Sequence, residues 1–179
     1  MKALLNIDYT VDFVVGALPC GKPAENIEQE IVRLTKVFAE NGDYVVFPVD
    51  MHTKGDKFHP ETSLYPPHNI VGTLGREFYG KLKSLYEGIK EQSNVYYMNK
   101  TRYSALAGTD LELKLRERGI TEVHICGVCT DICVLHTAVD LYNKGFQIVV
   151  HEKATASFNQ EGHKWAINHF KHVLGAKVI

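Results

Sequence analysis

The sequence predicts a three-layer α/β sandwich in which helices cover both faces of a six-stranded, mostly parallel sheet. Short apolar runs alternate with amphipathic stretches along all 179 residues. The apolar runs are continuous, as in strands that are buried on both faces, and their alternation with helical patterns is typical of a parallel sheet. No repeat, low-complexity tract or flexible linker divides the chain, so we expect residues 1–179 to form a single domain.

Six runs are expected to be strands because they are short, apolar and rich in β-branched and aromatic residues. They are Ala3–Ile7, Tyr44–Val49, Val95–Met98, Val123–Cys126, Phe146–Val150 and Ala176–Ile179.

Five helices are expected from apolar residues at helical spacing and from their end residues. The first carries the stripe Ile27, Ile31, Leu34 and Phe38 and ends at Gly42. The others are a stripe through Phe78, Leu82 and Leu85, a helix opened by a capping box of Thr109 and Glu112 and closed at Gly119, a helix capped by Thr130 or Asp131 that runs to Gly145, and Glu161–Val173.

The segment from Met51 to Leu74 does not fit this alternation. It is rich in proline and glycine, has little periodicity, and holds three of the nine histidines. A loop of this length inside a compact domain is uncommon and is usually functional.

Composition excludes several classes of protein. A hydrophobic fraction of 45% is that of a globular protein. A net charge of −1 gives no general attraction to nucleic acid or to an anionic membrane. The first residues lack the apolar core of an export signal, and no run reaches the roughly 18 apolar residues of a spanning helix. Three of the four cysteines lie within eight residues, from Cys126 to Cys133, which is a poor disulfide framework. We therefore expect reduced thiols and a cytoplasmic location.

Chemically active side chains follow four of the predicted strands. Ligands of open parallel sheets bind outside the carboxyl ends of the strands, so these side chains should share one edge. They are Asp8, the pair Asp50 and His52, Lys100, and the segment Gly127–Cys133.

Cys133 is expected in the first turn of the fourth predicted helix. Free N–H groups and the helix dipole there favour a thiolate and could bind an oxyanion. Asp8 could accept the thiol proton and return it to a leaving amine, and Lys100 could stabilise both anions. Each residue also has a structural interpretation: a small core thiol, a turn-capping carboxylate and a solvated loop lysine. Cys126 fits a structural role in the core, and for Cys129 both a structural and a functional role stay open.

The loop histidines suggest a metal site. Imidazole and carboxylate ligands suit zinc, iron or manganese, and an Asp-x-His pair on an extended segment places Asp50 and His52 on the same side. His59, Glu61 and His68 follow in the same loop. Any single histidine is better explained as a surface residue, but the group beside Cys133 favours a metal. Phe13, Tyr65 and Tyr103 flank these motifs and could hold a flat ring, although a core or lid role is equally open.

Several of these motifs together resemble the nicotinamidase/pyrazinamidase branch of the isochorismatase-like cysteine hydrolases. The resemblance covers nearly the whole chain, with the motifs in the family's order. They are Asp8-Tyr-Thr-Val-Asp12-Phe13, Asp50-Met-His52, Pro66-Pro67-His68, Lys100 and Gly127-Val-Cys-Thr-Asp131-Ile-Cys133-Val134.

The resemblance implies a Rossmann-like sheet and a catalytic triad of Asp8, Lys100 and Cys133. It also implies a cis peptide between Val128 and Cys129, which would aim the N–H groups of Cys129 and Cys133 at the oxyanion. The resemblance also suggests self-association, so we expect a homo-oligomer.

The family's metal ligands match Asp50, His52 and His68. For the fourth ligand the loop offers both His59 and Glu61. The stretch from Phe58 to His68 looks like members that use glutamate, so we expect Glu61, with His59 as a loop residue or a support for the ligands. Zinc is the expected metal, with iron or manganese as alternatives.

The resulting hypothesis is the hydrolysis of nicotinamide to nicotinic acid and ammonia in NAD salvage. The metal would hold the pyridine nitrogen between aromatic side chains, and Cys133 would attack the carboxamide to give a thioester that water releases. The main alternative is an amidase of the same fold that acts on another small carboxamide. A metal-binding or redox-sensing protein without catalysis would leave Asp8 and Lys100 unexplained, and the motifs of nucleotide-binding modules are absent.

Overall fold

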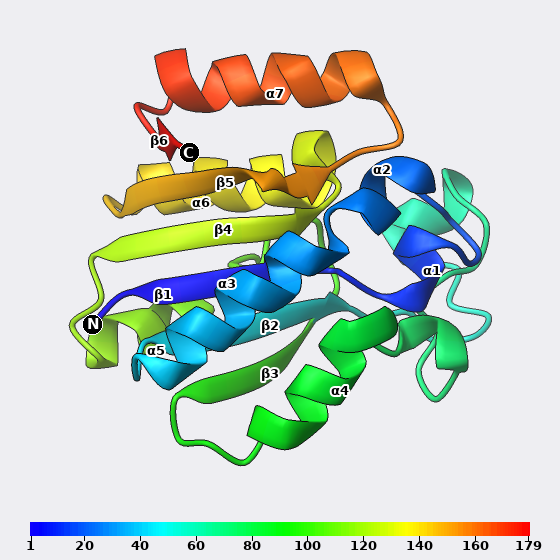
Figure 1. The fold of residues 1–179 in the computed structure, drawn as a ribbon. Coiled ribbons are helices and arrows are strands. Elements are labelled where there is room, and N and C mark those ends of the chain that lie inside the picture. The colour runs from blue at the N-terminus through cyan, green and yellow to red at the C-terminus, as the bar shows by residue number, and fades with distance from the viewer.

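The computed structural model describes residues 1–179 and contains the expected six-stranded sheet (Figure 1). Every neighbouring pair of strands is parallel, so the sheet is wholly rather than mostly parallel. The strand order is β3-β2-β1-β4-β5-β6, which confirms the Rossmann-like expectation. The strands are β1 (Ala3–Ile7), β2 (Tyr44–Asp50), β3 (Val95–Lys100), β4 (Glu122–Val128), β5 (Gln147–Ala156) and β6 (Lys177–Val178).

Helices cover both faces of the sheet, and Figure 1 shows α3 and α4 in front of it and α5 and α6 behind. Two of the helices, α1 and α2, were not predicted because they are too short to show an apolar stripe. The α-helices are α1 (Val11–Val14), α2 (Lys22–Asn26), α3 (Glu28–Glu40), α4 (Gly80–Ile89), α5 (Leu111–Glu117), α6 (Leu135–Asn143) and α7 (Gln160–His172).

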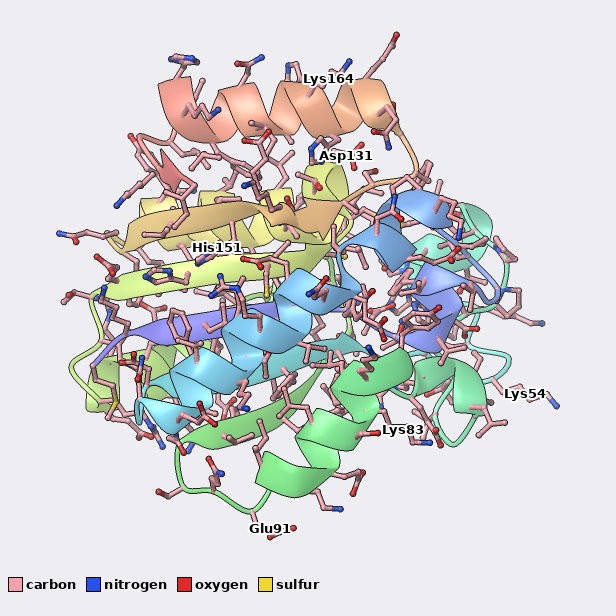
Figure 2. The ribbon with its side chains drawn as sticks, viewed as in Figure 1. Lys54, Lys83, Glu91, Asp131, His151 and Lys164 are labelled. Atoms are coloured by element: carbon pink, nitrogen blue, oxygen red, sulfur yellow. The ribbon has the colours of Figure 1, made fainter.

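The two faces of the sheet belong to two separate apolar cores. Successive side chains of a strand point to opposite faces, so Leu5 packs with α5, α6 and α7, whereas Leu4 packs with α1 to α4. Figure 2 shows charged side chains such as Lys54, Glu91 and Lys164 at the periphery. No helix is both long and apolar enough to cross a bilayer.

Two expected helix starts are wrong. The predicted capping box does not form, because Asp110 occupies the N-cap of α5 and the Thr109 hydroxyl donates back to the Ala105 carbonyl. Neither Thr130 nor Asp131 caps the helix that follows β4. The chain instead makes a π-helical turn over Thr130–Val134 before α6 begins, and Cys133 lies in that turn.

The topology brings the predicted motifs to one place. The chain order reverses between the central strands β1 and β4, and such a switch point opens a crevice at the carboxyl ends of the strands. Asp8 follows β1 and the π turn follows β4, with β2 and β3 alongside. The long loop after β2 carries two short 3₁₀ turns, Pro60–Ser63 and Leu74–Arg76, and covers this edge.

Candidate active site

Asp8, Lys100 and Cys133 lie in contact at the carboxyl edge of the sheet. The Lys100 ammonium is 2.7 Å from Asp8 Oδ2 and 3.6 Å from Cys133 Sγ. All three side chains are buried, with Asp8 and Lys100 almost completely shielded from solvent. The structure therefore brings together the three residues that the sequence selected, although their catalytic roles stay a prediction.

Burial and charge set the protonation of this group. Burial raises the pKa of Asp8 to about 6 against the opposing effect of Lys100, in the direction expected for a proton acceptor that works near neutrality. Burial lowers the pKa of Lys100, but Asp8, Cys133 and Asp50 outweigh it and hold that pKa well above its ordinary value. Burial also raises the pKa of Cys133, and Lys100 is the neighbour that lowers it. The resting state is therefore a thiol beside an ammonium–carboxylate pair.

The turn after β4 places backbone donors beside Cys133. The peptide bond between Val128 and Cys129 is cis, as the resemblance implied. The N–H of Cys129 donates to no group of the protein, which leaves it free for a ligand. The Cys129 side chain lines the same pocket as Cys133, whereas Cys126 is fully buried in β4, as a core role requires.

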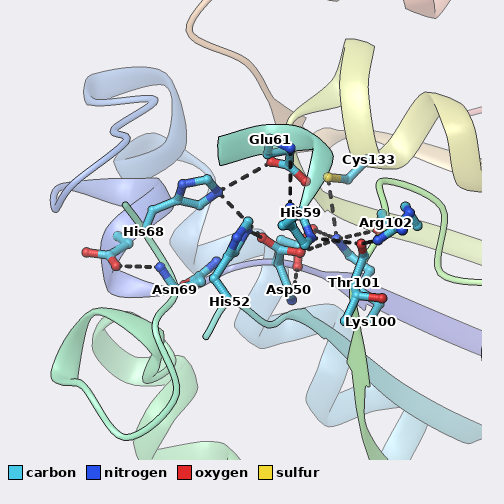
Figure 3. A network of polar contacts seen from close by, with 12 residues as sticks. Asp50, His52, His59, Glu61, His68, Asn69, Lys100, Thr101, Arg102 and Cys133 are labelled. Carbon is cyan, nitrogen blue, oxygen red and sulfur yellow. Dashed lines mark hydrogen bonds and ion pairs between the residues drawn. The ribbon is translucent and has the colours of Figure 1, made fainter. Parts of the chain in front are cut away.

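A second buried polar group lies beside the first, on β2 and the long loop (Figure 3). Each of its members offers one ligand atom, and these atoms all lie within 4.8 Å of one another. The members are Asp50, His52, Glu61 and His68, the four predicted ligands, and we call them the ligand group. Two carboxylates and two imidazoles form a donor set that suits a divalent cation.

Unsatisfied atoms in this group point to the same conclusion. His68 Nδ1 donates to the Pro66 carbonyl at 2.8 Å, so in the neutral ring Nε2 keeps a lone pair. Both His68 Nε2 and Asp50 Oδ1 are buried without a hydrogen-bond partner. Burial lowers the pKa of His68, but the carboxylates of Asp50 and Glu61, each 3.5 Å from Nε2, raise it to about 10. The group is thus short of positive charge, which fits a divalent cation.

His59 is not in the ligand group, which agrees with the expectation that Glu61 is the loop ligand. Its Nε2 lies 2.9 Å from the Thr101 carbonyl and its Nδ1 accepts the Glu61 N–H at 3.3 Å, so one neutral tautomer satisfies both contacts. Its ring also packs on that of His52, with centroids 4.1 Å apart. His59 therefore contacts two residues of the ligand group and the backbone next to Lys100.

The two groups are joined through Asp50. Asp8 Oδ1 accepts the Asp50 N–H at 2.7 Å, and Lys100 Nζ lies 3.6 Å from Asp50 Oδ1. On the outer side, Arg76 Nε donates to the Asp50 carbonyl at 2.8 Å. Sequence reasoning missed Arg76, because its 3₁₀ turn carries no motif.

A small apolar pocket opens beside Cys133 and Glu61. It is lined by the predicted aromatic residues Phe13, Tyr65 and Tyr103. It also includes Leu18, Ile132 and Phe158, which sequence reasoning missed. Phe158 follows the carboxyl end of β5 at Ala156, but the predicted strand ended at Val150, so the strand-end rule that found Asp8 did not reach it. A larger cleft of about 430 Å³ lies on the other side of the ligand group, between His52, Tyr65 and His68.

Comparison with known proteins agrees with this geometry. The isochorismatase domain model matches residues 2–179. The chain belongs to the isochorismatase family. Among curated proteins, the isochorismatase family protein PncA of Bacillus subtilis is 66% identical, with 99% of this chain and 98% of that protein covered.

Solved structures of the family superpose closely. The nicotinamidase/pyrazinamidase PncA of Bacillus subtilis has a TM-score of 0.98 at 67% identity and covers 99% of both chains. The pyrazinamidase/nicotinamidase of Streptococcus mutans has a TM-score of 0.97 at 51% identity over 100% of both chains. The pyrazinamidase of Pyrococcus horikoshii, solved with zinc, has a TM-score of 0.86 at 28% identity and covers 99% of this chain and 98% of its own.

Proposed function

We propose that this chain is a nicotinamidase, which hydrolyses nicotinamide to nicotinic acid and ammonia and so serves NAD salvage. The observation that carries the proposal is the contact between the Asp8–Lys100–Cys133 group and the four-ligand group, with one aromatic pocket reaching both. The names of the solved relatives agree with this substrate.

The proposed reaction starts at Cys133. Its thiol proton passes to Asp8 as Sγ attacks the carboxamide carbon, and Lys100 stabilises the anion that forms. The N–H groups of Cys129 and Cys133 donate hydrogen bonds to the developing oxyanion. Asp8 then gives the proton to the amine as the C–N bond breaks, and ammonia leaves a thioester on Cys133. A water molecule, deprotonated by Asp8, attacks the thioester and releases the acid and the thiol.

Asp50, His52, Glu61 and His68 would hold the metal, and zinc is the form we propose, since the donor set suits it and a relative was solved with it. When bound, the metal supplies a Lewis-acid contact for the ring nitrogen. Phe13, Tyr65 and Tyr103 enclose the faces of the ring. The expected single domain over residues 1–179, cytoplasmic location and self-association belong to this proposal.

The test is the release of ammonia from nicotinamide by the purified protein and by Cys133→Ala. We expect turnover by the wild type and a loss of at least about 10⁴-fold in the variant. A benzamide control, which lacks the ring nitrogen, should react far more slowly. Unchanged turnover by Cys133→Ala would show that Cys133 is not the nucleophile. Turnover of other carboxamides but not of nicotinamide would show that the enzyme has a different substrate.

A further inference from the structure

One pair of thiols has no part in the proposed reaction. Cys20 Sγ and Cys129 Sγ lie 3.1 Å apart, although 109 positions separate them in the sequence. Both are buried, with exposed fractions of 4% and 6%. A sulfur–sulfur separation this short needs only about 1 Å of closure to reach the 2.05 Å of a disulfide.

The two thiols belong to two different segments that line the apolar pocket. Cys129 lines the pocket and belongs to the turn that carries the free N–H donor and Cys133. Cys20 lies between α1 and α2, and its N–H donates to the Phe13 carbonyl at 2.8 Å, in the segment that contributes Phe13 and Leu18 to the pocket. A bond between the two sulfurs would therefore tie the oxyanion turn to a wall of the pocket.

The fourth cysteine shows that this pairing is specific. Cys126 belongs to the same apolar core and precedes Cys129 by three residues, but its thiol has no polar partner. The Cys-x-x-Cys spacing in the sequence therefore does not describe a pair in the fold. The partner of Cys129 comes instead from a distant loop.

We propose that Cys20 and Cys129 form an oxidisable dithiol site, whose disulfide slows the enzyme reversibly by shifting the oxyanion turn. The co-reactant is a small two-electron oxidant of the peroxide class, which reaches Cys129 through the pocket. One thiol loses its proton as its sulfur attacks the peroxide O–O bond, and that proton joins the leaving hydroxide, which gives a sulfenic acid and water. The second thiol then attacks the sulfenic sulfur, and its proton leaves with the displaced hydroxide as another water. Two thiols and one H₂O₂ thus give one disulfide and two waters.

Closure of the two sulfurs moves the Cys129 backbone, and displacements near 1 Å at a reacting centre can cost up to about 10²-fold in rate. We expect kcat to fall by about tenfold with little change in KM, and a dithiol reductant to restore it. This kinetic effect depends on the proposed amidase function, whereas formation of the disulfide does not.

The experiment treats the reduced protein with hydrogen peroxide and, separately, with diamide, and then blocks free thiols and maps the peptides without reduction. The variants are Cys20→Ser, with Cys20→Ala as a second form, the matched control Cys126→Ser, and Cys133→Ala, which removes the reactive nucleophile. We expect a Cys20–Cys129 cross-link and a mass loss of two hydrogens in the wild type, Cys126→Ser and Cys133→Ala, and none in the Cys20 variants.

Cross-links to Cys126, or oxidation of Cys133 with Cys20 and Cys129 still unlinked under both reagents, would overturn the proposal. If the mapped cross-link forms but turnover of nicotinamide is unchanged, the site stands and its effect on the enzyme is rejected.

Discussion

The triad group and the ligand group are both buried polar clusters, but they differ in how they balance charge. In the group of Asp8, Lys100 and Cys133, one ammonium faces one carboxylate at 2.7 Å, so the charges are matched inside the protein. The ligand group has two carboxylates and no lysine or arginine of its own, and it leaves Asp50 Oδ1 and His68 Nε2 without hydrogen-bond partners. Asp8 Oδ2 also lacks a hydrogen bond, but the Lys100 ammonium at 2.7 Å balances its charge, whereas the ligand group has no such cation of its own.

The two groups also differ in the elements that carry them. Asp8 directly follows β1, Lys100 is the last residue of β3, and Cys133 lies in the turn after β4; hydrogen bonding within the sheet fixes the relative positions of these strands. Three of the four ligands come instead from the loop after β2. We therefore expect the loss of a charged side chain to lower stability and activity through the triad group. We expect the loss of metal to lower them through the ligand group.

Lys100→Met should have the largest effect. Removal of the ammonium leaves Asp8 as a buried, unpaired carboxylate, which costs about 3–5 kcal/mol of unfolding free energy, and kcat/KM should fall by at least roughly 10³-fold. The double variant Asp8→Asn/Lys100→Met should recover most of the stability and none of the activity. Urea denaturation and ammonia release measure the two effects. A double variant as unstable as the single one would contradict the charge-matching argument.

Metal removal should have the second largest effect and should act through the ligand group alone. A tightly bound metal at 1,000 times its Kd stabilises the fold by about 4 kcal/mol, so chelation should lower Tm and added zinc should restore it. Activity should fall by roughly 10²-fold, because the substrate ring is no longer held in place. His52→Ala should have the lower Tm from the start and should not respond to chelator. Cys133→Ala is the control, and it should keep the wild-type metal content and the same response to chelation.

The sequence was sufficient for the residues that follow strands and insufficient for those that depend on the path of the loop. Asp8, Asp50, Lys100 and Cys133 could be placed together because all parallel strands end at one edge. The choice between His59 and Glu61 needed a family resemblance. These residues are two positions apart at a 3₁₀ turn, and both are buried, so neither spacing nor polarity separates them. Only the fold shows His59 against Thr101 and Glu61 among the ligands.

Residues of the pocket wall were missed for a related reason. Leu18 and Phe158 lie outside the long helices, in segments without periodicity. In such a segment the sequence does not distinguish an apolar residue of a pocket from one of the surface or the core. Cys20 could not have been paired with Cys129 from sequence, since the contact depends on how α1 and α2 fold over the end of β4.

His59→Ala should have a smaller effect than metal removal and should weaken the metal site without removing a ligand. Side chains that orient metal ligands contribute about 10–100-fold to metal affinity, and His59 holds both the Glu61 N–H and the His52 ring. Competition with a chromophoric chelator measures the affinity directly. His172→Ala, at the exposed end of α7, is the matched control and should bind metal as the wild type does. Equal affinity for both variants would show that the loop holds Glu61 without His59.

Phe158→Ala should have the smallest effect and should touch neither group. Its ring lines the pocket beside Cys133 but is 49% exposed, so a bound substrate gains only part of the ring's area as contact. We expect KM for nicotinamide to rise by about threefold, or about 0.7 kcal/mol, with kcat, metal content and Tm unchanged. Phe58→Ala, on the loop with a 95% exposed ring, is the control and should change nothing. A fall in kcat in Phe158→Ala would mean that this rim also positions Cys133, and that the triad group depends on a loop as the ligand group does.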